Sequence, residues 1–340
     1  MKIMKYLSAL LCIAGCVVAQ EAPVERTYPA QITFRVKTDM GEPVSNVEVG
    51  VSTFLRWEPG EGFGRDINQT FTEKTNKDGI AIIHAESKRG RFGYGVKDTP
   101  GFYRDYGDYY KFNEVKEGRW EPWNPVIDVV LKPIIKPIPM YARKMGDITR
   151  LLELPVAAGQ SVGFDLMVAE WVAPYGKGKV ADLVFTLNEL VPLTDAENPF
   201  DYTLTLTFAN EGDGIQSVFA PPHKGSDLRL PRFAPEGGYE AKLEKRIGRS
   251  ARGQPLNTGT REDQNYFFRV RTVLDEQGRI KSALYGKISG DMACDVINSR
   301  KGYVIFTYYL NPTSLDRNLE FDPQHNLSKG LRRSEKINEP

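Results

Sequence analysis

Ten aromatic residues lie between positions 92 and 123, and they are the strongest indication of chemistry in the sequence. Arg104, Asp105, Asp108 and Asn113 are interleaved with them. Sugars present apolar C–H faces and a rim of hydroxyl groups, so exposed aromatic rings beside carboxylates and amides suit a glycan. The alternative is packing, because an aromatic side chain buries about 150–250 Å² and can cover the end of a small sandwich. The residues expected to contact a glycan are Tyr103, Tyr106, Tyr109, Trp120 and Trp123.

Carboxylates near the C-terminal end are a second group of candidates. Asp316, Glu320 and Asp322 lie close together in a segment expected to be a loop. Calcium takes roughly six to eight oxygen ligands, so such carboxylates could hold it, although the spacing fits no EF-hand. Ordinary solvated turn carboxylates are the alternative, here and at the weaker case of residues 211–214. No cofactor other than this calcium is indicated.

A secreted glycan hydrolase is one interpretation of the acidic residues. A glycosidase needs only two carboxylates, about 5–9.5 Å apart depending on its mechanism. Glu170 and Asp182 are the candidates under this interpretation, because Trp171 and Tyr175 lie near them in the sequence. The sequence alone neither identifies nor excludes such a pair.

Other catalytic centres are not expected. The histidines His84, His223 and His325 lie in different segments, without the ligand spacing typical of zinc sites. No glycine-rich phosphate loop is present, and no serine nucleophile elbow is expected. Cys294 is expected to be a small buried apolar group rather than a nucleophile.

The first nineteen residues have the pattern of a signal peptide. Lys2 and Lys5 precede an uncharged, mostly apolar stretch over residues 6–15. This stretch is shorter than the roughly 20 residues of a membrane-spanning helix. We therefore expect export to the bacterial envelope, the periplasm or the extracellular space, as a soluble or lipid-anchored protein.

Two cleavage sites compete. Residues 17–19, Val-Val-Ala, suit ordinary signal peptidase and leave Gln20 first. Residues 13–16, Ile-Ala-Gly-Cys, resemble a bacterial lipobox, in which Cys16 would be lipidated. A lipid on Cys16 would be the expected contact with a membrane, at about 0.8 kcal/mol per buried methylene. Residues 20–29 are polar and are expected to form a tether.

Composition limits the partners and the compartment. Forty-five Lys and Arg residues nearly balance 44 Asp and Glu residues, so the basic excess typical of nucleic-acid binding is absent. Cys12 leaves with the signal peptide, so Cys294 has no thiol partner and no intramolecular disulfide is expected. A length of 340 residues indicates two domains, at roughly 100–200 residues each.

The region 30–133 is expected to be a small β-sandwich. Several of its segments alternate apolar and polar residues, as half-buried strands do. Two of them flank the turn 76–79, which ends in Asp-Gly, a strong hairpin signal. The expected strands are residues 31–37, 47–54, 70–75, 80–85 and 126–131.

Two stretches of this region carry a family pattern: VKTDMGEPVSNVEVGV at 36–51 and TEKTNKDGIAII at 72–83. A strand, a turn with Gly and Pro, an apolar strand, and then a Thr and an Asp-Gly turn follow one another. The arrangement resembles the carboxypeptidase regulatory-like domain, a prealbumin (transthyretin)-like β-sandwich. The resemblance covers under a third of the chain. It implies an accessory module without catalysis, since such domains are appended to peptidases, transporters, adhesins and binding proteins.

A proline-rich connector is expected over residues 134–150. Pro137 and Pro139 favour extended backbone. Ile134 and Ile135 are too apolar for a solvated linker, so we expect the connector to be short, stiff and packed onto a domain.

The remainder, residues 151–328, is expected to be a larger, jelly-roll-like β-sandwich that resembles no characterised family. Residues 221–259 are expected to be irregular, with one or two helical turns near 239–247. Eight basic and four acidic residues give this stretch an excess of 8 − 4 = +4, which suggests contact with an anionic envelope polymer or lipid. The tail 329–340 is expected to be polar and mobile. The expected strands are residues 164–172, 180–187, 202–209, 266–274, 280–288 and 303–310.

The sequence thus favours an exported, all-β, non-catalytic binding or structural protein. A glycan or another envelope polymer is the expected partner, and nucleic acid is not. The rival is the secreted glycan hydrolase, with residues 30–133 as its accessory module.

Overall fold

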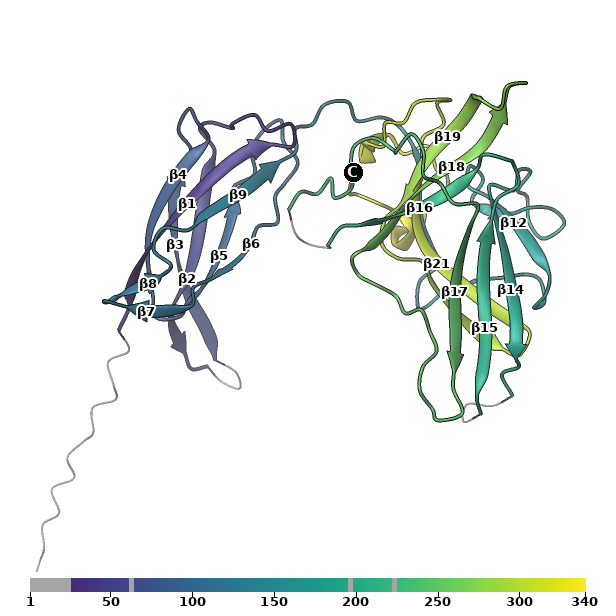
Figure 1. Ribbon diagram of the computed structural model, residues 1–340, viewed down its shortest axis with the longest axis horizontal. Coiled ribbons are helices and arrows are strands. Elements are labelled where there is room, and N and C mark those ends of the chain that lie inside the picture. Colours follow the sequence, from purple (N-terminus) through teal and green to yellow (C-terminus); the bar gives the residue numbers. More distant parts are fainter. Residues whose placement is uncertain (1–25, 61–63, 195–197, 222–224) are drawn as a thin grey trace, which may run out of the picture.

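The structure, a computed structural model, describes residues 26–60, 64–194, 198–221 and 225–340. It consists almost entirely of β-strands, in two lobes joined at one end (Figure 1). The helices of these residues are two 3₁₀ turns, η1 (Pro323–His325) and η2 (Arg333–Glu335), and neither could cross a membrane. The prediction of an all-β fold is confirmed. The signal segment, the lipobox with Cys16 and most of the tether lie outside the described residues.

The N-terminal lobe is a sandwich of two sheets with a small added hairpin. Its strands are β1 (Tyr28–Thr38), β2 (Glu48–Glu58), β3 (Arg65–Lys74), β4 (Ile80–Ser87), β5 (Arg91–Val96), β6 (Asp108–Lys111), β7 (Glu114–Lys116), β8 (Arg119–Glu121) and β9 (Val126–Leu131). One sheet has the order β4-β1-β9 and the other β3-β2-β5-β6, while β7 pairs with β8. The inward faces of the two sheets share one core, which includes Phe34, Val49, Val51 and Phe92.

The Asp-Gly turn between β3 and β4 is formed as predicted. The Gly79 N–H donates to the Asn76 carbonyl at 3.0 Å, and Gly79 has φ +73°. A Cβ at this position would lie 2.3 Å from the Val36 carbonyl oxygen. The turn therefore requires glycine both for its conformation and for its close approach to β1.

The second lobe is a larger two-sheet sandwich. Its strands are β10 (Tyr141–Met145), β11 (Leu152–Glu153), β12 (Ser161–Asp165), β13 (Glu170–Trp171), β14 (Leu183–Val191), β15 (Phe200–Thr207), β16 (Gly214–Phe219), β17 (Lys242–Arg249), β18 (Gln264–Leu274), β19 (Ile280–Ile288), β20 (Ala293–Asn298) and β21 (Lys301–Leu310). One sheet has the order β10-β21-β19-β18-β16, with β11 and β20 also on β21, and the other β13-β12-β14-β15-β17. Only four of the paired neighbours, β12-β13, β14-β15, β18-β19 and β20-β21, follow one another along the chain, and the other pairings join strands that are not consecutive. The two-sheet sandwich agrees with the expectation, and its jelly-roll-like order stays a prediction.

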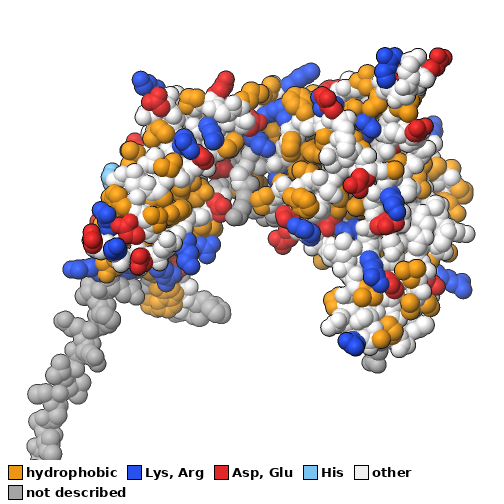
Figure 2. Space-filling model, viewed as in Figure 1, with side chains coloured by type: hydrophobic (Ala, Val, Ile, Leu, Met, Phe, Trp, Pro, Cys, Tyr) orange, Lys and Arg blue, Asp and Glu red, His pale blue; other side chains and the backbone are white. Residues whose placement is uncertain are grey.

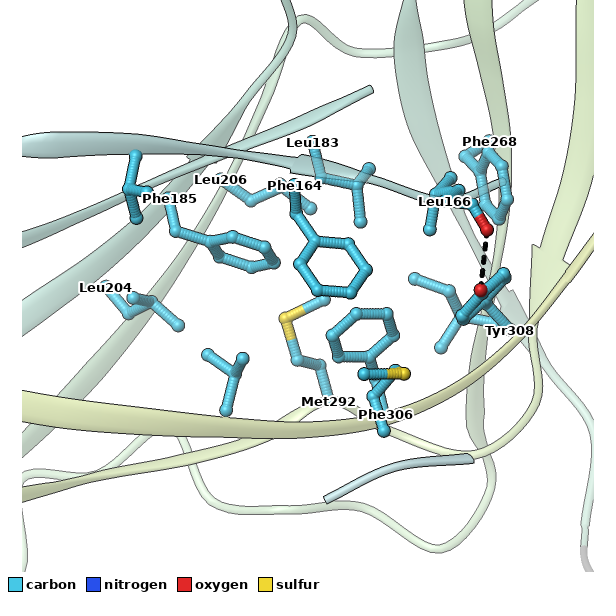
Figure 3. Close-up of a cluster of buried hydrophobic side chains, with 14 of the residues drawn as sticks. Phe164, Leu166, Leu183, Phe185, Leu204, Leu206, Phe268, Met292, Phe306 and Tyr308 are labelled. Atoms are coloured by element: carbon cyan, nitrogen blue, oxygen red, sulfur yellow. Dashed lines mark hydrogen bonds between the residues drawn. The ribbon is translucent and has the colours of Figure 1, made fainter. Parts of the chain in front are cut away.

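An aromatic core joins the two sheets of the second lobe (Figure 3). The Phe306 ring lies 5.9 Å from Phe164 and 6.1 Å from Phe185, centroid to centroid. The buried Tyr308 hydroxyl donates to the Leu166 carbonyl at 2.6 Å. Full burial of such side chains contributes about 1.5–3 kcal/mol each, so this core is a major source of stability.

Residues 242–249 form strand β17, and the expected helical turns near 239–247 are wrong. Leu243, Lys245 and Ile247 alternate toward the interior. The buried Lys245 Nζ donates to Asp291 Oδ1 at 2.6 Å and to the Met292 carbonyl at 2.7 Å. A lysine at an inward position hides the apolar alternation from which a strand is predicted.

The single strand expected over residues 164–172 is instead two strands, β12 and β13. The Asp165 carboxylate accepts the backbone N–H groups of Met167 at 3.0 Å and Val168 at 3.3 Å, which closes a turn. Ala169 then adopts φ +59° and leads into β13. An aspartate that caps its own turn thus interrupts an otherwise apolar segment.

The connector between the lobes packs against both of them. The Ile134 N–H donates to the Gly101 carbonyl and the Ile138 N–H to the Glu320 carbonyl, both at 2.8 Å. The extended segment ends earlier than the expected residue 150, because β10 pairs with β21.

The C-terminal tail is not free. Glu335 forms a 2.8 Å ion pair with Arg143, and each side chain is only 16% exposed. Ile337 packs against buried residues of the second lobe. Part of the tail at residues 329–340 thus packs against the second lobe, and its mobility stays a prediction.

Candidate functional site

A groove of about 1270 Å³ covers the outer face of the sheet β3-β2-β5-β6. Its residues come from all four strands and from the segment before β6. Small residues form the floor, and aromatic and charged side chains surround them. The lining includes Gly50, Ser52, Phe54, Thr70, Thr72, Gly93, Gly95, Tyr106, Gly107 and Tyr109, with the charged residues Glu48, Asp66, Arg89, Arg91 and Lys97.

The register of β2 with β3 and β5 brings small residues together on the floor of the groove. Gly50 on β2 lies between Thr72 on β3 and Gly95 on β5. In the next outward row, Ser52 lies between Thr70 and Gly93. Alternate residues of a strand point to opposite faces. The same strands that fill the core with valine and phenylalanine therefore present glycine, serine and threonine to the outside.

The glycine at position 50 is not required by the fold. A Cβ there would meet its nearest neighbours, the Cγ2 atoms of Thr70 and Thr72, at an ordinary 3.8 Å. Gly50 is also absent from the positive-φ residues. A glycine inside a strand costs about 0.5–1 kcal/mol relative to alanine. Such a glycine often marks a place where a ligand or another backbone approaches closely.

Two tyrosines stand beside this floor. The Tyr109 side chain is 62% exposed, and the Arg91 guanidinium carbon lies 4.0 Å from the centre of its ring. A Cβ at Gly93 would lie 3.3 Å from Tyr109 Cε1, so the ring leans over this glycine. Tyr106 is less exposed and has Arg104 stacked on its ring at 4.6 Å. The arginines hold the rings in place through cation–π contacts.

Charges in the groove largely compensate one another. Arg89 pairs with Asp66 at 3.0 Å, and Lys97 pairs with Glu48 at 3.4 Å. Arg89 also covers the ring of Phe54 at 3.5 Å. The groove therefore offers aromatic faces, hydroxyl groups and paired charges, and it lacks the one-sign field that a polyanion would require.

The five expected glycan contacts do not share one surface. The structure places Tyr106 and Tyr109 at the groove. Trp120 is half-buried, its Nε1–H donates to the Ser87 carbonyl at 3.0 Å, and its ring lies 6.3 Å from that of Phe112. Trp123 lies under Arg119 at 5.0 Å, away from the groove residues.

The fifth, Tyr103, lies at the junction of the lobes. Its hydroxyl donates to Glu320 Oε1 at 2.8 Å. The backbone N–H groups of Ile135 and Lys136 also donate to Glu320, each at 2.9 Å, and Arg232 forms an ion pair with it at 2.5 Å. Burial alone would raise the pKa of Glu320, but these donors outweigh it and hold that pKa below its usual value.

The expected calcium ligands are therefore not gathered around one point. Glu320 is fully buried among its donors, whereas Asp316 accepts the Asn318 N–H at 3.0 Å. Asp322 accepts the Gln324 N–H at 2.9 Å and contacts His325 Nδ1 at 2.7 Å. Within the described ranges, no three His, Cys, Asp or Glu side chains are arranged to hold a metal ion.

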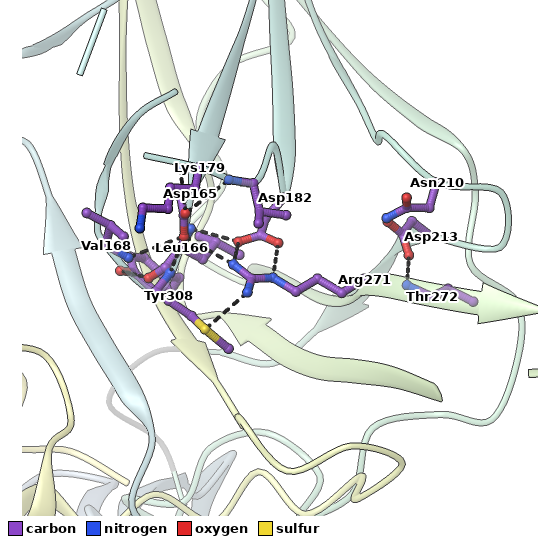
Figure 4. Close-up of polar contacts among 12 residues, drawn as sticks. Asp165, Leu166, Val168, Lys179, Asp182, Asn210, Asp213, Arg271, Thr272 and Tyr308 are labelled. Atoms are coloured by element: carbon purple, nitrogen blue, oxygen red, sulfur yellow. Dashed lines mark hydrogen bonds and ion pairs between the residues drawn. The ribbon is translucent and has the colours of Figure 1, made fainter. Parts of the chain in front are cut away.

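The expected hydrolase carboxylates are not paired on a surface (Figure 4). Asp182 is buried, its Oδ1 bonds Arg271 Nε at 2.7 Å, and its Oδ2 accepts the Leu166 N–H at 2.9 Å. Burial raises the pKa of Asp182 despite Arg271. Glu170 accepts the Lys177 N–H at 3.0 Å. Trp171 is buried in the core and Tyr175 is exposed, so these four residues form no substrate site.

A serine nucleophile elbow, with its pattern Gly-x-Ser-x-Gly, was also expected to be absent, but the pattern does occur in the sequence. Residues 159–163 read Gly-Gln-Ser-Val-Gly. The structure nevertheless places Ser161 at the start of β12, with its hydroxyl 2.7 Å from that of Thr186. A nucleophile elbow requires a sharp turn between a strand and a helix, so this serine has a structural role.

Histidine and cysteine chemistry is not supported among the described residues. His84 is exposed on β4 and His325 contacts Asp322, while His223 lies outside those residues. Cys294 is half-buried, and burial raises the pKa of its thiol to about 12. A thiol with such a pKa is almost fully protonated at neutral pH and is a poor nucleophile.

Three basic residues of the stretch 221–259 are paired with carboxylates of the protein itself. Arg232 and Lys245 are buried with carboxylate partners. Arg246 pairs with Asp201 at 2.6 Å. The expectation that this stretch contacts an anionic polymer or lipid stays a prediction.

A comparison with protein-family models found no match to the chain, and a comparison with curated proteins found no significant relative. The evidence for a functional groove is therefore its geometry alone.

The floor of the groove was not predicted from the sequence, although the sequence contains a pattern that indicates it. In the segment 91–96, Arg-Phe-Gly-Tyr-Gly-Val, two of the three residues that alternate with the buried side chains are glycine.

Proposed function

We propose that the protein is an exported, non-catalytic binding protein whose N-terminal lobe holds a glycan in the groove on β3-β2-β5-β6. The observation that carries this proposal is the floor without a side chain at Gly50, in the same groove as the exposed ring of Tyr109. Export is proposed from the N-terminal pattern of the sequence, and a prealbumin-like, regulatory-like module from the motifs at 36–51 and 72–83.

Sugar chemistry accounts for each part of the groove. The C–H face of a pyranose can stack on Tyr109, while its hydroxyl groups can bond Ser52, Thr70 and Thr72. Because the floor lacks side chains, a flat, extended chain can approach the backbone closely. The paired charges favour a neutral or weakly charged glycan.

The hydrolase alternative has less support. Its best carboxylate, Asp182, has both oxygens bonded within the protein and is buried. The carboxylates that line the groove are those of Glu48, Asp66 and Asp108. Glu48 and Asp66 each pair with a cation, and Asp108 Oδ1 accepts the Tyr109 N–H at 2.8 Å. A binding role therefore agrees better with the geometry than hydrolysis does.

A broad glycan array tests this function directly. The chain from Gln20 onward should bind at least one class of glycan saturably and should release no sugar product from it. Tyr109→Ala should weaken that binding at least tenfold, because the C–H face of the sugar can no longer stack on the tyrosine ring.

The matched control is Tyr175→Ala, which removes an exposed tyrosine of the second lobe. This variant should bind as the unaltered protein does. A blank array, or binding that Tyr109→Ala leaves intact, would contradict a glycan function for the groove.

A further inference from the structure

Four basic side chains meet at the junction of the lobes: Lys132, Arg229, Arg232 and Lys287. Arg232 is compensated by Glu320 at 2.5 Å and by Asp39 at 3.7 Å. Lys132 Nζ donates to three backbone carbonyls, the closest that of Leu228 at 2.7 Å. Neither Lys287 nor Arg229 has a carboxylate within ion-pair distance among the described residues.

Lys287 is an uncompensated buried cation. The residue is 2% exposed, and its Nζ donates to one acceptor, the Leu319 carbonyl, at 2.9 Å. The same nitrogen lies 4.6 Å from the centre of the Tyr309 ring. An ammonium group has three donors, so two of them have no hydrogen-bond acceptor in the described structure. A buried charge without a partner is costly, which indicates that a partner belongs here.

Arg229 is incompletely bonded in the same way. Its Nη2 bonds Asn265 Oδ1 and lies 3.3 Å from the Ser289 hydroxyl. Its Nε is buried without a hydrogen-bond partner. Asn265 and Ser289 are neutral, so they satisfy donors of the guanidinium without balancing its charge.

A cavity of about 90 Å³ lies between these two cations. One water needs roughly 10–15 Å³ of such space, so the cavity has room for an ion of several heavy atoms. The N-terminal lobe contributes Tyr106 to its wall, and the second lobe contributes most of the rest. The lining residues are Tyr106, Ser226, Asp227, Arg229, Leu230, Lys287, Ser289, Tyr309, Glu339 and Pro340.

We propose that this cavity binds a small oxyanion, either a carboxylate or a phosphate group. Lys287 Nζ and Arg229 Nε would donate to its oxygens, and the Ser289 hydroxyl would add a third donor. Guanidinium and ammonium groups favour such oxyanions through charge-assisted hydrogen bonds. Asp227 and the exposed Glu339 also line the cavity and repel an anion, so the attraction of Lys287 and Arg229 has to outweigh them. The volume of about 90 Å³ limits the site to a small group.

This site is distinct from the glycan groove, although the two share one residue. Tyr106 lines both the groove and the cavity. The oxyanion could be a free ion or the acid group of a sugar. Those sources present the same chemistry to Lys287 and Arg229.

Calorimetric titration of the chain from Gln20 onward tests the proposal with three probes: inorganic phosphate, acetate and glucuronate. The titration is run at pH 6, where Lys287 is protonated, with chloride holding the ionic strength constant. We expect saturable binding of one ion per chain for at least one probe. Preference for glucuronate over acetate would identify a sugar acid as the source, and preference for phosphate a free phosphate or phosphoryl group.

Lys287→Met and Arg229→Gln should each weaken that binding at least tenfold. Lys301→Met, which removes an exposed lysine of β21, should leave it unchanged. Circular dichroism establishes that each variant is folded, and the titration of the unaltered protein stands even if one variant is not. Absence of saturable binding for all three probes, or equal binding by two folded variants, would overturn the proposal.

Discussion

Lys287 illustrates how one side chain can set the pH response of a protein. Burial, together with the neighbouring Lys132 and Arg229, lowers its pKa to about 7 against the opposing effect of Glu320. In the unfolded chain a lysine titrates near a pKa of about 10.4. Below pH 7 folding must therefore bury a charged ammonium. Between pH 7 and about 10.4 the unfolded state binds more protons, so this penalty fades as the pH rises.

The variant Lys287→Met should remove this penalty while nearly preserving volume. In buffer without oxyanions we expect the free energy of unfolding to rise at pH 6, by about 1–4 kcal/mol. The gain should be smaller at pH 9, where the folded state of the unaltered protein is already neutral at this position. Urea unfolding at both pH values measures the difference. An equal gain at the two pH values would show that Lys287 is not buried in its charged form.

Strand β18 shows how an irregular element can place a charge. Its pairing with β19 shifts register between Val270 and Val273, and Arg271 within this bulge has φ +55°. The bulge directs the Arg271 guanidinium to Asp182 at 2.7 Å and Asp165 at 3.1 Å (Figure 4). Burial would raise the pKa of Asp165, but the N–H groups of Lys179, Val180 and Val168, with Arg271, lower it. One arginine thus joins three strands, β12, β18 and the start of β14.

Arg271→Met should therefore destabilise the second lobe. Two buried carboxylates would lose their cation, at a cost of about 3–5 kcal/mol. Burial already raises the pKa of Asp182 with Arg271 in place, and loss of the cation should raise it further, so the folded variant takes up a proton at this carboxylate earlier as the pH falls. The loss, measured by urea unfolding, should be smaller at pH 5 than at pH 8. Arg279→Met, at an exposed turn, should cost about 0–1 kcal/mol, and a similar cost for both variants would contradict this account.

Elements with a regular pattern were predictable, and those held by long-range polar contacts were not. Alternation predicted β1, β4 and β9, and Asp-Gly predicted the turn at Gly79. Strand β17 was missed because Lys245 occupies a core position that Asp291, 46 residues further on, makes tolerable. In the candidate site, aromatic content predicted Tyr106 and Tyr109. The glycine floor was missed because β2 and β5, about 40 residues apart along the chain, must be paired in the right register before Gly50 and Gly95 become neighbours.

At the scale of the whole molecule, the two lobes are joined by more than the connector. The Tyr106 N–H donates to the Gly225 carbonyl at 2.8 Å, and the Asp227 N–H donates to the Arg104 carbonyl at 2.9 Å. Lys132 and Glu320 add contacts between the lobes from the polar cluster described above. Figure 2 shows two lobes that meet at one end and enclose an open space at the other, with charges of both signs spread over the visible face. These contacts link residues more than 90 positions apart, so no local sequence pattern predicts them.

The central claim is that the groove on β3-β2-β5-β6 binds a glycan across Gly50. The variant Gly50→Val tests it most directly, because valine suits a strand and a Cβ at Gly50 would meet only ordinary contacts, at 3.8 Å. Gly237→Val, at an open site without positive φ in the second lobe, is the matched control.

The measurement is the affinity of each variant for the glycan identified on the array, with its melting temperature determined in parallel. We predict that Gly50→Val melts no lower than the unaltered protein and binds at least tenfold more weakly, while Gly237→Val binds normally. A folded Gly50→Val protein with unchanged affinity would place the glycan elsewhere and contradict the account.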